Sequence, residues 1–568
     1  MNEINAASKV FKVEMMFKDR NYWTLNKMLE YRAQTHGDEI FLQYKEESPL
    51  TFKYIHEITN TIAHGLSGLG IKKGDNVLIF LPNCLEFIYT WFALSKLGAV
   101  QVPVNTAYKG YFLDHISNNS MAKVMIVDQE FTDRVKNSED NLKHLEKIII
   151  LEHDKSDKNR SIPSRFKVSA YQSLYDNPPV TPGVEVSYMD NAAIMYTSGT
   201  TGLSKGVALA HAWMHVMAER MIAMFHITKD DTYLLYLPLF HGNAQAMIVM
   251  ACMISRAKVV IYKKFSASGW VDMIQKSNAS LTNLVGVMMD AVFRQPERDD
   301  DNMNNLRGIN AYPCPSAIVE SFKKRFDVAQ MLEIYGMTET GLITLMPFGD
   351  YRADSCGKIA EDFVEVIIAD PETDEELPVG HVGELLVRPK IPWTLNSGYY
   401  RMPDKTTEAY RNAWFHTGDG LKVDQDGYYY FVDRIKDALR KGGENISSFE
   451  VESIINDHPA VAESAVVAVK SESCGGEDEV KACIVLNLNH DLTHDEILSW
   501  CDDKLPRFCV PRYIEFVEAL PKTPTEKVMK GKLRDQGITL ATYDRIAAGY
   551  FKTCFLQPKN APPFTTEN

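Results

Sequence analysis

The segment at residues 196–206, YTSGTTGLSKG, has the composition of a loop that binds phosphate. Its glycines leave backbone N–H groups accessible, its Ser and Thr hydroxyls add donors, and Lys205 adds a cation. An apolar strand candidate precedes it at residues 192–195, and a helix-like segment follows it. It is not a Walker A loop, because Ser204 stands before the lysine and Gly206 after it. For such a composition alone, a solvated linker is the alternative.

Further polar motifs follow along the chain. Glu339 ends YGMTE and offers the carboxylate oxygen that a hard cation such as Mg²⁺ prefers. Asp419 lies in WFHTGDG and Arg434 in YYYFVDR, and either residue alone could be part of a turn or a surface ion pair. Lys527 lies in a basic segment, LPKTPTEKVMKGKLR, where a single lysine is usually a solvated charge. Order and combination make these motifs specific.

Together the strings resemble the adenylate-forming superfamily, which includes acyl-CoA ligases, luciferases and the adenylation domains of peptide synthetases. The resemblance extends from about Trp23 to Arg534 and rests on five separated motifs in the correct order. It implies ATP, Mg²⁺ and coenzyme A as cosubstrates or cofactors. The ATP-binding residues that it implies are Thr197, Ser198, Gly199, Thr200, Thr201, Gly202, Tyr335, Asp419 and Arg434.

The resemblance also implies individual roles. Tyr335 would stack on adenine, Thr338 would bond the α-phosphate, and Glu339 would bind the metal. The implied catalytic residues are Lys527, Thr338, Glu339 and Lys205, with Lys436 as the hinge between two domains and Gly442 and Gly443 lining the coenzyme A tunnel. This chain departs from the family in one respect, since Glu526 stands before Lys527 where a glycine is usual.

The implied reaction has two steps. A carboxylate attacks the α-phosphorus of ATP, which gives an acyl-adenylate and releases pyrophosphate, and a thiol then displaces AMP. Negative charge concentrates on the phosphate oxygens in the first step, and cations and N–H donors fixed around them stabilise it. In relatives the C-terminal unit rotates between the steps, which removes the lysine and brings in the glycine pair.

The acid itself is less well defined by the sequence. By family position, the acyl pocket involves His241, Asn243, Tyr312, Gly336 and residues 285–288. Strings such as HGNAQ, PTEKVMKGKLR and ATYDRIAAGY resemble crotonobetaine/carnitine-CoA ligases. A betaine would suit aromatic walls through cation–π contact, with Phe240, Tyr312 and Trp213 as candidates. Other short-chain, sulfonated or fatty acids stay open.

The elements that position these motifs alternate between helix and strand. Residues 23–34 and 84–99 have helical spacing, whereas 76–82, 122–128 and 144–152 resemble buried strands. This alternation predicts an α/β fold with largely parallel sheets. From about residue 361 short strands with turn signals predict a smaller β-rich subdomain.

The chain is too long for one compact core. We expect a large N-terminal domain at residues 1–433 and a small, mobile α+β domain at 434–568, which carries Lys527 and ends in a disordered Pro-rich tail. The segment RKGGENI is expected to form a turn between a helix and a strand.

Bulk composition narrows the class further. The 75 acidic and 61 basic residues give a formal net charge of -14, which argues against a general affinity for nucleic acid. Nine scattered cysteines without a CxxC pair indicate a reduced compartment, and the apolar run at 246–254 is too short to span a membrane. We therefore expect a cytoplasmic enzyme, with a homodimer left open.

Two rival interpretations remain at this point. An adenylating enzyme could transfer its acyl group to a carrier protein or to oxygen, although no carrier domain follows Lys532. Alternatively, the chain could be an inactive nucleotide-binding protein, and this would predict loss of the key side chains. Lys205, Glu339, Asp419 and Lys527 are all present, which favours the enzyme.

Overall fold

The computed structural model describes residues 9–153, 163–197, 204–285, 288–312, 314, 316–434, 439–441, 444–446, 448–470, 478–488, 490–522 and 528–550. Apart from residues 198–203, the chain divides into two compact units, the first ending at Lys436 and the second beginning at Asp437. The boundary expected between residues 433 and 434 stays a prediction, because locating a hinge requires two conformations.

The first unit contains two seven-stranded sheets. One has the order β7-β6-β5-β3-β4-β8-β9 and is parallel except for its β8–β9 pair. Its strands are β3 (Asn76–Phe80), β4 (Val100–Pro103), β5 (Val124–Asp128), β6 (Lys147–Leu151), β7 (Lys167–Ala170), β8 (Asn191–Thr197) and β9 (Lys205–Ala210). Most of these strands are apolar and buried, as the sequence predicts for parallel strands covered on both faces.

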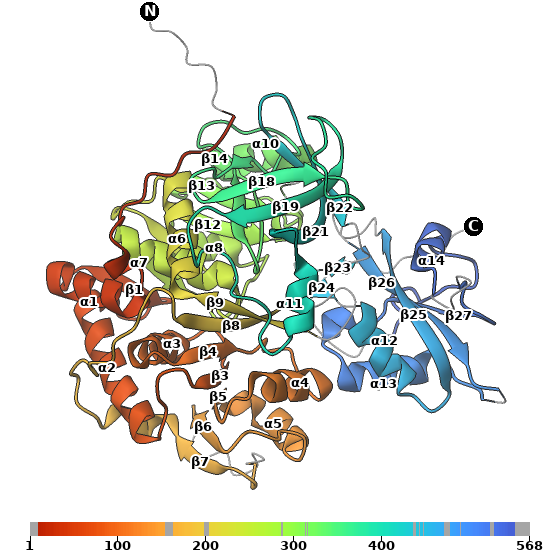
Figure 1. Cartoon of the computed structure of the whole chain (residues 1–568), viewed down its shortest axis with the longest axis horizontal. Coiled ribbons are helices and arrows are strands. Elements are labelled where there is room, and N and C mark those ends of the chain that lie inside the picture. Colours follow the sequence, from red (N-terminus) through yellow and green to blue (C-terminus); the bar gives the residue numbers. More distant parts are fainter. Residues whose placement is uncertain are drawn as a thin grey trace, which may run out of the picture. The chain divides into compact units, whose positions relative to one another are not determined.

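The second sheet has the order β14-β13-β12-β10-β11-β1-β2 and is parallel except for β1–β2. Figure 1 labels its strands β1, β12, β13 and β14. Its strands are β1 (Ile40–Tyr44), β2 (Leu50–Thr51), β10 (Thr232–Leu235), β11 (Lys258–Ile261), β12 (Leu281–Val285), β13 (Gly308–Tyr312) and β14 (Gln330–Leu332). The chain leaves β10 for β11 on one side and returns to β12 on the other, so the strand order reverses at β10.

Helices connect and cover these sheets. They are α1 (Leu25–His36), α2 (Phe52–Gly68), α3 (Leu85–Leu97), α4 (Tyr111–Ser120), α5 (Thr132–Ser138), α6 (His211–Phe225), α7 (Ala251–Ser255), α8 (Trp270–Ser277), α9 (Met288–Phe293) and α10 (Ser316–Phe326). Helix α3 ends at a glycine, since Gly98 adopts a left-handed φ of 64°. Helix α6 is buried on nearly all sides, which is typical of a helix enclosed by packed layers.

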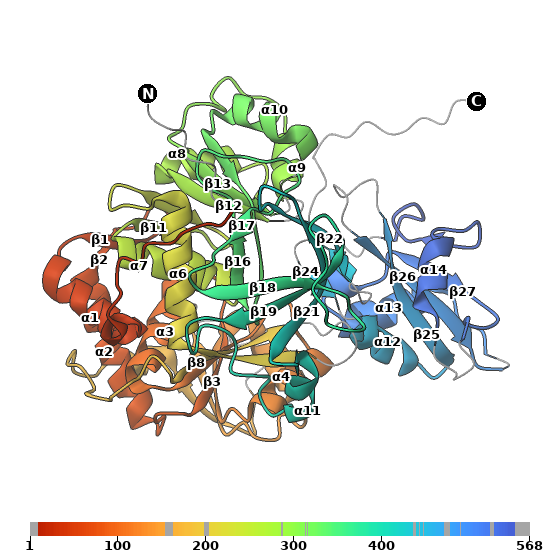
Figure 2. The same cartoon turned by 45° about the horizontal axis from the view of Figure 1, so that its top comes forward.

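Shorter strands complete the first unit. β15 (Ile334–Met337), β16 (Gly341–Leu345) and β17 (Lys358–Ile359) form one small sheet. β18 (Val364–Ala369), β19 (Gly383–Pro389), β20 (Tyr410–Arg411), β21 (Trp414–Val423) and β22 (Tyr429–Arg434) form another, and α11 (Pro403–Ala409) precedes β20. Figure 2 shows β18, β19 and β21 side by side. The predicted β-rich subdomain is confirmed.

The second unit is α+β. A four-stranded sheet has the order β25-β26-β27-β28, with α12, α13 and α14 joining it. The elements are β23 (Leu439–Lys441), β24 (Glu444–Ile446), α12 (Ser448–Asn456), β25 (Val461–Lys470), β26 (Asp478–Leu486), α13 (His494–Lys504), β27 (Tyr513–Phe516), α14 (Lys530–Gln536) and β28 (Tyr543–Asp544). The predicted class, a large α/β unit followed by a smaller α+β unit, is confirmed.

Two local expectations were wrong. The phosphate-loop candidate leads into β9, and helix α6 begins only at His211, because residues 205–210 pair with β8. The glycine pair lies between two strands, β23 and β24, in place of a helix and a strand. Both segments are short enough to fit either element, and tertiary pairing decides between them.

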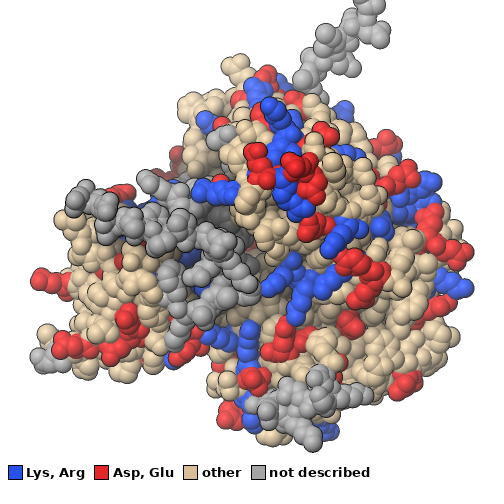
Figure 3. All heavy atoms as spheres, turned by 180° about the vertical axis from the view of Figure 1, so that it is seen from behind, with Lys and Arg blue, Asp and Glu red and all other residues tan. Residues whose placement is uncertain are grey.

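Surface and membrane features are ordinary. Within the described ranges, none of the helices has the length and apolarity that crossing a bilayer requires. Basic and acidic side chains are interspersed over the face drawn in Figure 3. Seven cysteines in the described residues are free thiols.

Candidate active site

Helix α4 holds both ends of the candidate phosphate loop. On the incoming strand β8, the Tyr196 hydroxyl donates a 2.7 Å hydrogen bond to Oδ1 of Asn119. On the outgoing side, Nε2 of His115 lies 2.8 Å from the Ser204 carbonyl, which it hydrogen-bonds as a donor. Burial lowers the pKa of His115, so the ring stays neutral near pH 7. The loop termini are therefore fixed at Thr197 and Lys205, which pair across β8 and β9.

Glu339 lies directly beside these two strand ends. Its carboxylate is 4% exposed, and Oε1 accepts hydrogen bonds from the hydroxyls of Thr197, at 3.5 Å, and Tyr399, at 2.9 Å. Lys205 contacts the same tyrosine, with Nζ 3.1 Å from the hydroxyl oxygen and 4.2 Å from the ring centroid. The structure thus brings Thr197, Lys205 and Glu339 together through Tyr399, a residue that the sequence analysis missed.

The segment that carries Tyr399 is tied to both sides of this cluster. Asn396 donates from its backbone N and from Nδ2 to the Glu339 carbonyl, each at 2.9 Å. Ser397 and Tyr400 form backbone hydrogen bonds to residues of β9. The ring position of Tyr399 is therefore fixed by main-chain pairing, and this gives the carboxylate a preset orientation.

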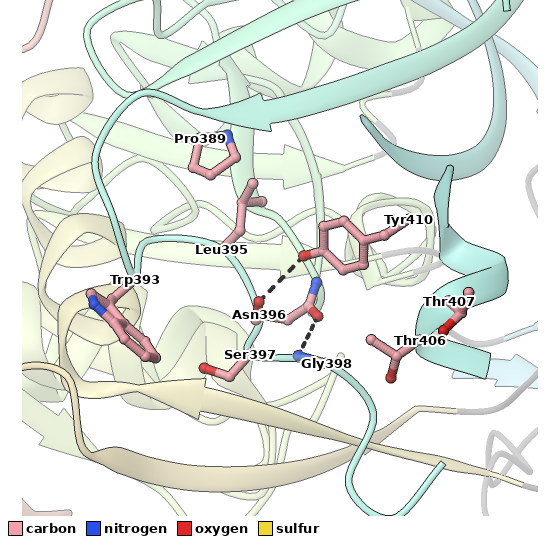
Figure 4. Close-up of a pocket in the computed structure, with 9 residues that line it drawn as sticks. All are labelled: Pro389, Trp393, Leu395, Asn396, Ser397, Gly398, Thr406, Thr407 and Tyr410. Carbon is pink, nitrogen blue, oxygen red and sulfur yellow. Dashed lines mark hydrogen bonds between the residues drawn. The ribbon is translucent and has the colours of Figure 1, made fainter. Parts of the chain in front are cut away.

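A groove of about 510 Å³ lies on the outer side of the same segment (Figure 4). It is lined in part by Trp393, Leu395, Asn396, Thr406 and Tyr410. The Tyr410 hydroxyl donates to the Asn396 carbonyl at 3.3 Å. None of the site residues predicted from the sequence lines this groove, so we interpret its wall as a support for the Tyr399 segment.

Two motifs meet at Tyr335. Its hydroxyl donates a 2.7 Å hydrogen bond to Oδ2 of Asp419, and its ring stacks on Phe431 with centroids 6.1 Å apart. Asp419 lies opposite Arg434 in the β21–β22 pair. Three of the predicted ATP-binding residues are therefore neighbours in the fold, although the Arg434 side chain lies outside the described residues.

The turn between β15 and β16 carries Thr338 and Glu339. Thr338 is half-buried there. A Cβ at Gly336 would lie 2.4 Å from the Gly341 carbonyl oxygen across the pair, so the two strands approach too closely for any side chain. This close approach accounts for Gly336 independently of its expected place in the acyl pocket.

The described residues fit a magnesium ion that is carried by a nucleotide. Mg²⁺ commonly binds one or two carboxylates plus substrate phosphates, and it keeps several waters. Among the described side chains, no group of three His, Cys, Asp or Glu forms a closed metal cage. Glu339 suits the open type of site, because both of its hydrogen-bonded hydroxyls use Oε1.

Three of the acyl-pocket candidates end or follow parallel strands of the second sheet. Asn243 follows β10, Val285 ends β12, and Tyr312 ends β13. In open α/β sheets, ligands bind outside the carboxyl ends where the strand order reverses, and β10 is that position here. The topology therefore supports a ligand crevice at these residues.

Asn243 begins a π-helix, Asn243–Met250, a rare form that is frequent at functional sites. Its Nδ2 donates to the Tyr312 hydroxyl, and its Oδ1 accepts a 2.9 Å hydrogen bond from Asn283. The His241 ring packs on Phe240 with centroids 4.5 Å apart. Trp213 lies against this segment, since a Cβ at Gly242 would be 3.0 Å from its ring. The candidate crevice at the carboxyl ends of these strands would thus have both polar and aromatic side chains.

In the second unit, the described residues on either side of 523–527, the segment that ends at the predicted adenylation lysine, are paired. Lys522 and Val528 form an antiparallel bridge, and Met529 N donates to the Pro521 carbonyl at 2.8 Å. Lys530 is held by Glu452 at 2.6 Å. Lys441 and Glu444 pair on either side of the glycine pair.

Several predicted residues lie outside the described residues. They are Ser198, Gly199, Thr200, Thr201, Gly202, Lys436, Gly442, Gly443 and Lys527. Their roles stay predictions, as do the roles of the residues that the structure places.

Sequence reasoning missed five residues near the site: His115, Asn119, Asn283, Asn310 and Tyr399. Asn283 and Asn310 carried a usable signal, because each is the central polar residue of a buried strand, LTNLV and GINAY. Tyr399, His115 and Asn119 had none, since their positions depend on contacts between distant segments.

Two known protein families match successive parts of the chain. Residues 29–400 match the AMP-binding enzyme family, and residues 450–527 match the AMP-binding enzyme C-terminal domain. Together the matched segments span most of the chain and include the motifs at residues 196–206 and 335–339 as well as Lys527, whereas the motifs that contain Asp419, Arg434 and the glycine pair lie between the two matches.

Individual proteins agree with the family match. Crotonobetaine/carnitine–CoA ligases of Salmonella agona and Salmonella typhi are each 31% identical over 523 residues, which cover 90% of this chain and 98% of theirs. The anthranilate CoA ligase AuaEII, solved with anthranoyl-AMP, is 26% identical with a TM-score of 0.67, covering 93% of this chain and 98% of its own. An o-succinylbenzoate CoA synthetase from Bacillus subtilis shares the fold, with a TM-score of 0.77 and 24% identity over 89% of this chain and 98% of its own.

Proposed function

Because this chain belongs to the AMP-binding enzyme family and is an AMP-forming acid–CoA ligase, we propose that its acid is a small polar or betaine-type acid such as carnitine or crotonobetaine. ATP and coenzyme A are the other substrates in this family. The proposal concerns the acid, the residues that act on it and the metal.

The observation that carries the proposed chemistry is the cluster around Glu339. A buried carboxylate next to a lysine and the mouth of a glycine-rich loop can hold a nucleotide phosphate through a metal on one side and N–H donors on the other. Mg²⁺, when bound, would neutralise phosphate charge at Glu339. Thr338, in the same turn, would donate to the α-phosphate.

The nucleoside would bind at the second cluster. Tyr335 would present its ring to adenine, while Asp419 and Arg434 would hold the ribose hydroxyls. The bond from Tyr335 to Asp419 supports this assignment, because it orients the carboxylate before ATP arrives. Ser198, Gly199, Thr200, Thr201 and Gly202 would surround the phosphates from the loop.

Lys527 would stabilise the charge that develops on the α-phosphate during adenylation. Removing one such donor typically lowers the rate by about a hundred- to a thousandfold. Rotation of residues 434–568 about Lys436 would then replace this lysine by Gly442 and Gly443, which leave room for pantetheine. The adenylate hydrolyses in water, so the site must close around it.

The relatives and the crevice both support a polar acid. Two relatives that are 31% identical to this chain act, by name, on crotonobetaine and carnitine, and the match covers 98% of their length. The crevice combines Trp213 and Phe240, which suit a quaternary ammonium group, with Asn243 and Tyr312, which suit a polar substituent. We also infer a cytoplasmic location and leave a homodimer open.

A panel of acids, with pyrophosphate release as the readout, tests the proposal. Carnitine, crotonobetaine and γ-butyrobetaine should be turned over faster than short-chain, sulfonated and fatty acids. If all three fail while another acid reacts quickly, the betaine proposal is wrong. Omitting coenzyme A should cause acyl-AMP to accumulate, and undiminished turnover without coenzyme A would indicate another acceptor.

A further inference from the structure

The Asn310 carboxamide is an unusual buried group beneath the carboxyl end of β13. Asn310 is fully buried in the middle of β13, and neither its Oδ1 nor its Nδ2 has a hydrogen-bond partner among the described residues. Buried amide groups are almost always paired, because an unpaired one loses its bonds to water without replacement. Such a group therefore indicates a partner that comes from outside the chain.

Its neighbours are paired with one another. Asn283 lies beside Asn310 in register across β12 and β13. The Asn283 side chain accepts from the Tyr233 hydroxyl at 2.5 Å and donates to Asn243 at 2.9 Å. Asn243 in turn donates to Tyr312. These four residues satisfy each other and leave Asn310 out.

Strand geometry places Asn310 on the crevice side of the sheet. Register partners in parallel strands share a face, and so do residues two apart along one strand. Asn310 therefore shares a face with Asn283, its partner, and with Tyr312, which is two residues further on. Since Asn283 and Tyr312 both bond through Asn243, all of them line one polar layer beneath the carboxyl ends of the strands.

This layer is neutral. Its side chains are amides and phenols, and burial raises the pKa of the Tyr233 hydroxyl well above its ordinary value, which keeps it protonated. At the opposite end of β13, Arg307 and Asp231 form an ion pair with each other, with Nε and Oδ1 2.7 Å apart. A charged substituent would lack a counterion here, whereas a neutral polar group would not need one.

We propose that Asn310 recognises a hydroxyl group on the acyl chain of the substrate acid. One hydroxyl can accept from Nδ2 and donate to Oδ1, and it thereby satisfies both idle atoms of the carboxamide. The inference rests on the proposed function, because it assigns a substrate class to the same crevice. Among betaines it favours carnitine, which carries a hydroxyl, over crotonobetaine and γ-butyrobetaine, which do not.

The enzyme should discriminate against an acid that lacks the hydroxyl, because that acid leaves the Asn310 carboxamide unpaired. A site built to hydrogen-bond a substrate hydroxyl rejects the analogue that lacks it more strongly than an apolar pocket rejects a missing methylene, because the buried polar group stays unpaired. We expect kcat/KM to favour a hydroxy acid over its deoxy analogue by about a hundredfold.

Matched pairs of acids test this directly in the full-length enzyme. Carnitine and γ-butyrobetaine differ only by the hydroxyl, as do 3-hydroxybutyrate and butyrate. The preference for the hydroxy acid should hold in each pair that is turned over, and Asn310→Leu should reduce it to within a few fold of unity. Asn310→Ala supplies the same ratio if Asn310→Leu does not fold. Equal kcat/KM within every pair for the parent enzyme, or an unchanged preference in both variants, would overturn the proposal.

Thr282→Val is the matched control. Thr282 lies on the opposite face of β12, and its buried hydroxyl donates to the Leu234 carbonyl at 3.1 Å. This variant should lose thermal stability and keep the hydroxyl preference. Asn310→Leu should instead lose the hydroxyl preference. Without substrate, its melting temperature should equal or exceed that of the parent.

The melting temperature also separates the two hypotheses. If betaines fail but another acid reacts, the proposed substrate is wrong, while a hydroxy/deoxy pair of that acid still decides the role of Asn310. If no acid reacts, stability decides, because a melting temperature that falls in Asn310→Leu as it does in Thr282→Val shows that a bound water already satisfies the carboxamide. That result would overturn the inference.

Discussion

The Tyr335 hydroxyl donates a 2.7 Å hydrogen bond to the Asp419 carboxylate, and this joins two sequence motifs 84 residues apart. Asp419 is 3% exposed, and its backbone N also donates to the Thr417 hydroxyl. A carboxylate held in this way has one preferred orientation, so little rearrangement is needed when a ribose binds.

Tyr335→Phe should raise the KM for ATP by about tenfold, since it removes one hydrogen bond to a charged group and keeps the ring. The measurement is pyrophosphate release as a function of ATP concentration. Tyr54→Phe, on an exposed tyrosine, is the control and should leave the KM unchanged. An unchanged KM in Tyr335→Phe would show that Asp419 does not depend on this bond.

Tyr399→Phe should raise the Mg²⁺ concentration that the enzyme requires more than it raises the KM for the acid. The hydroxyl links Lys205 to Glu339, so its loss removes one hydrogen bond from each side chain. We expect the Mg²⁺ concentration for half-maximal rate to rise about tenfold. Tyr410→Phe, which removes a hydroxyl bonded to the Asn396 carbonyl of the same segment, is the control. Equal shifts in both variants would contradict a specific role for Tyr399.

Asn119→Ala should raise the KM for ATP several-fold, because it releases Tyr196 at one end of the phosphate loop. Asn118→Ala removes hydrogen bonds to Asn141 and Lys143 that face away from the loop. Both variants should lose about 1 kcal/mol of stability. Only Asn119→Ala should change ATP affinity, and equal ATP titrations for the two variants would refute the anchoring role.

Lys527→Ala should abolish adenylation, with a loss of about a hundredfold or more, and leave thioester formation from synthetic acyl-AMP largely intact. Both half-reactions are measured on the full chain. Lys532→Ala, on an exposed lysine of the same segment, should affect neither. Equal loss of both half-reactions in Lys527→Ala would refute a scheme with two conformations.

The free energy of unfolding should rise with pH because of Lys96, a residue remote from the site. Burial lowers the pKa of the Lys96 ammonium to about 7 from 10.5. Its partners are Asn60 and His56. Between these two pH values the unfolded chain binds more protons than the folded one, so the free energy of unfolding increases as pH rises.

Lys96→Met tests this linkage by denaturant unfolding across that pH window. As the pH increases, the free energy of unfolding of the parent should rise relative to that of Lys96→Met. A difference that is independent of pH would mean that Lys96 titrates normally in the folded protein.

Much of the fold could be predicted from periodicity. The helix at α3 and the strands at β3, β5 and β6 are long apolar segments with clear end signals, and the structure places them as expected. Segment β9 was missed because KGVALA fits a helix as well as a strand, and only its pairing with β8 decides. That pairing cannot be predicted from the local sequence.

The site residues likewise divide into those that local sequence identifies and those whose roles depend on distant contacts. Lys205, Glu339, Tyr335 and Asp419 lie in strings that can be recognised one at a time. Tyr399 could not be found so, because its function depends on bonds to residues 60 and 194 positions away. Asn310 is a third kind of case: its type and setting are visible in GINAY, but the absence of a partner emerges only when its neighbours are known.

The polar layer is built on β12 and β13, inside a seven-stranded sheet, and not on the loops above it. Grafting surface loops from another ligase onto this scaffold would consequently leave the preference for a hydroxyl group unchanged. Redirecting the enzyme toward apolar acids would require a change inside the sheet at Asn310, whose replacement leaves the hydrogen bonds among Asn283, Asn243, Tyr233 and Tyr312 intact.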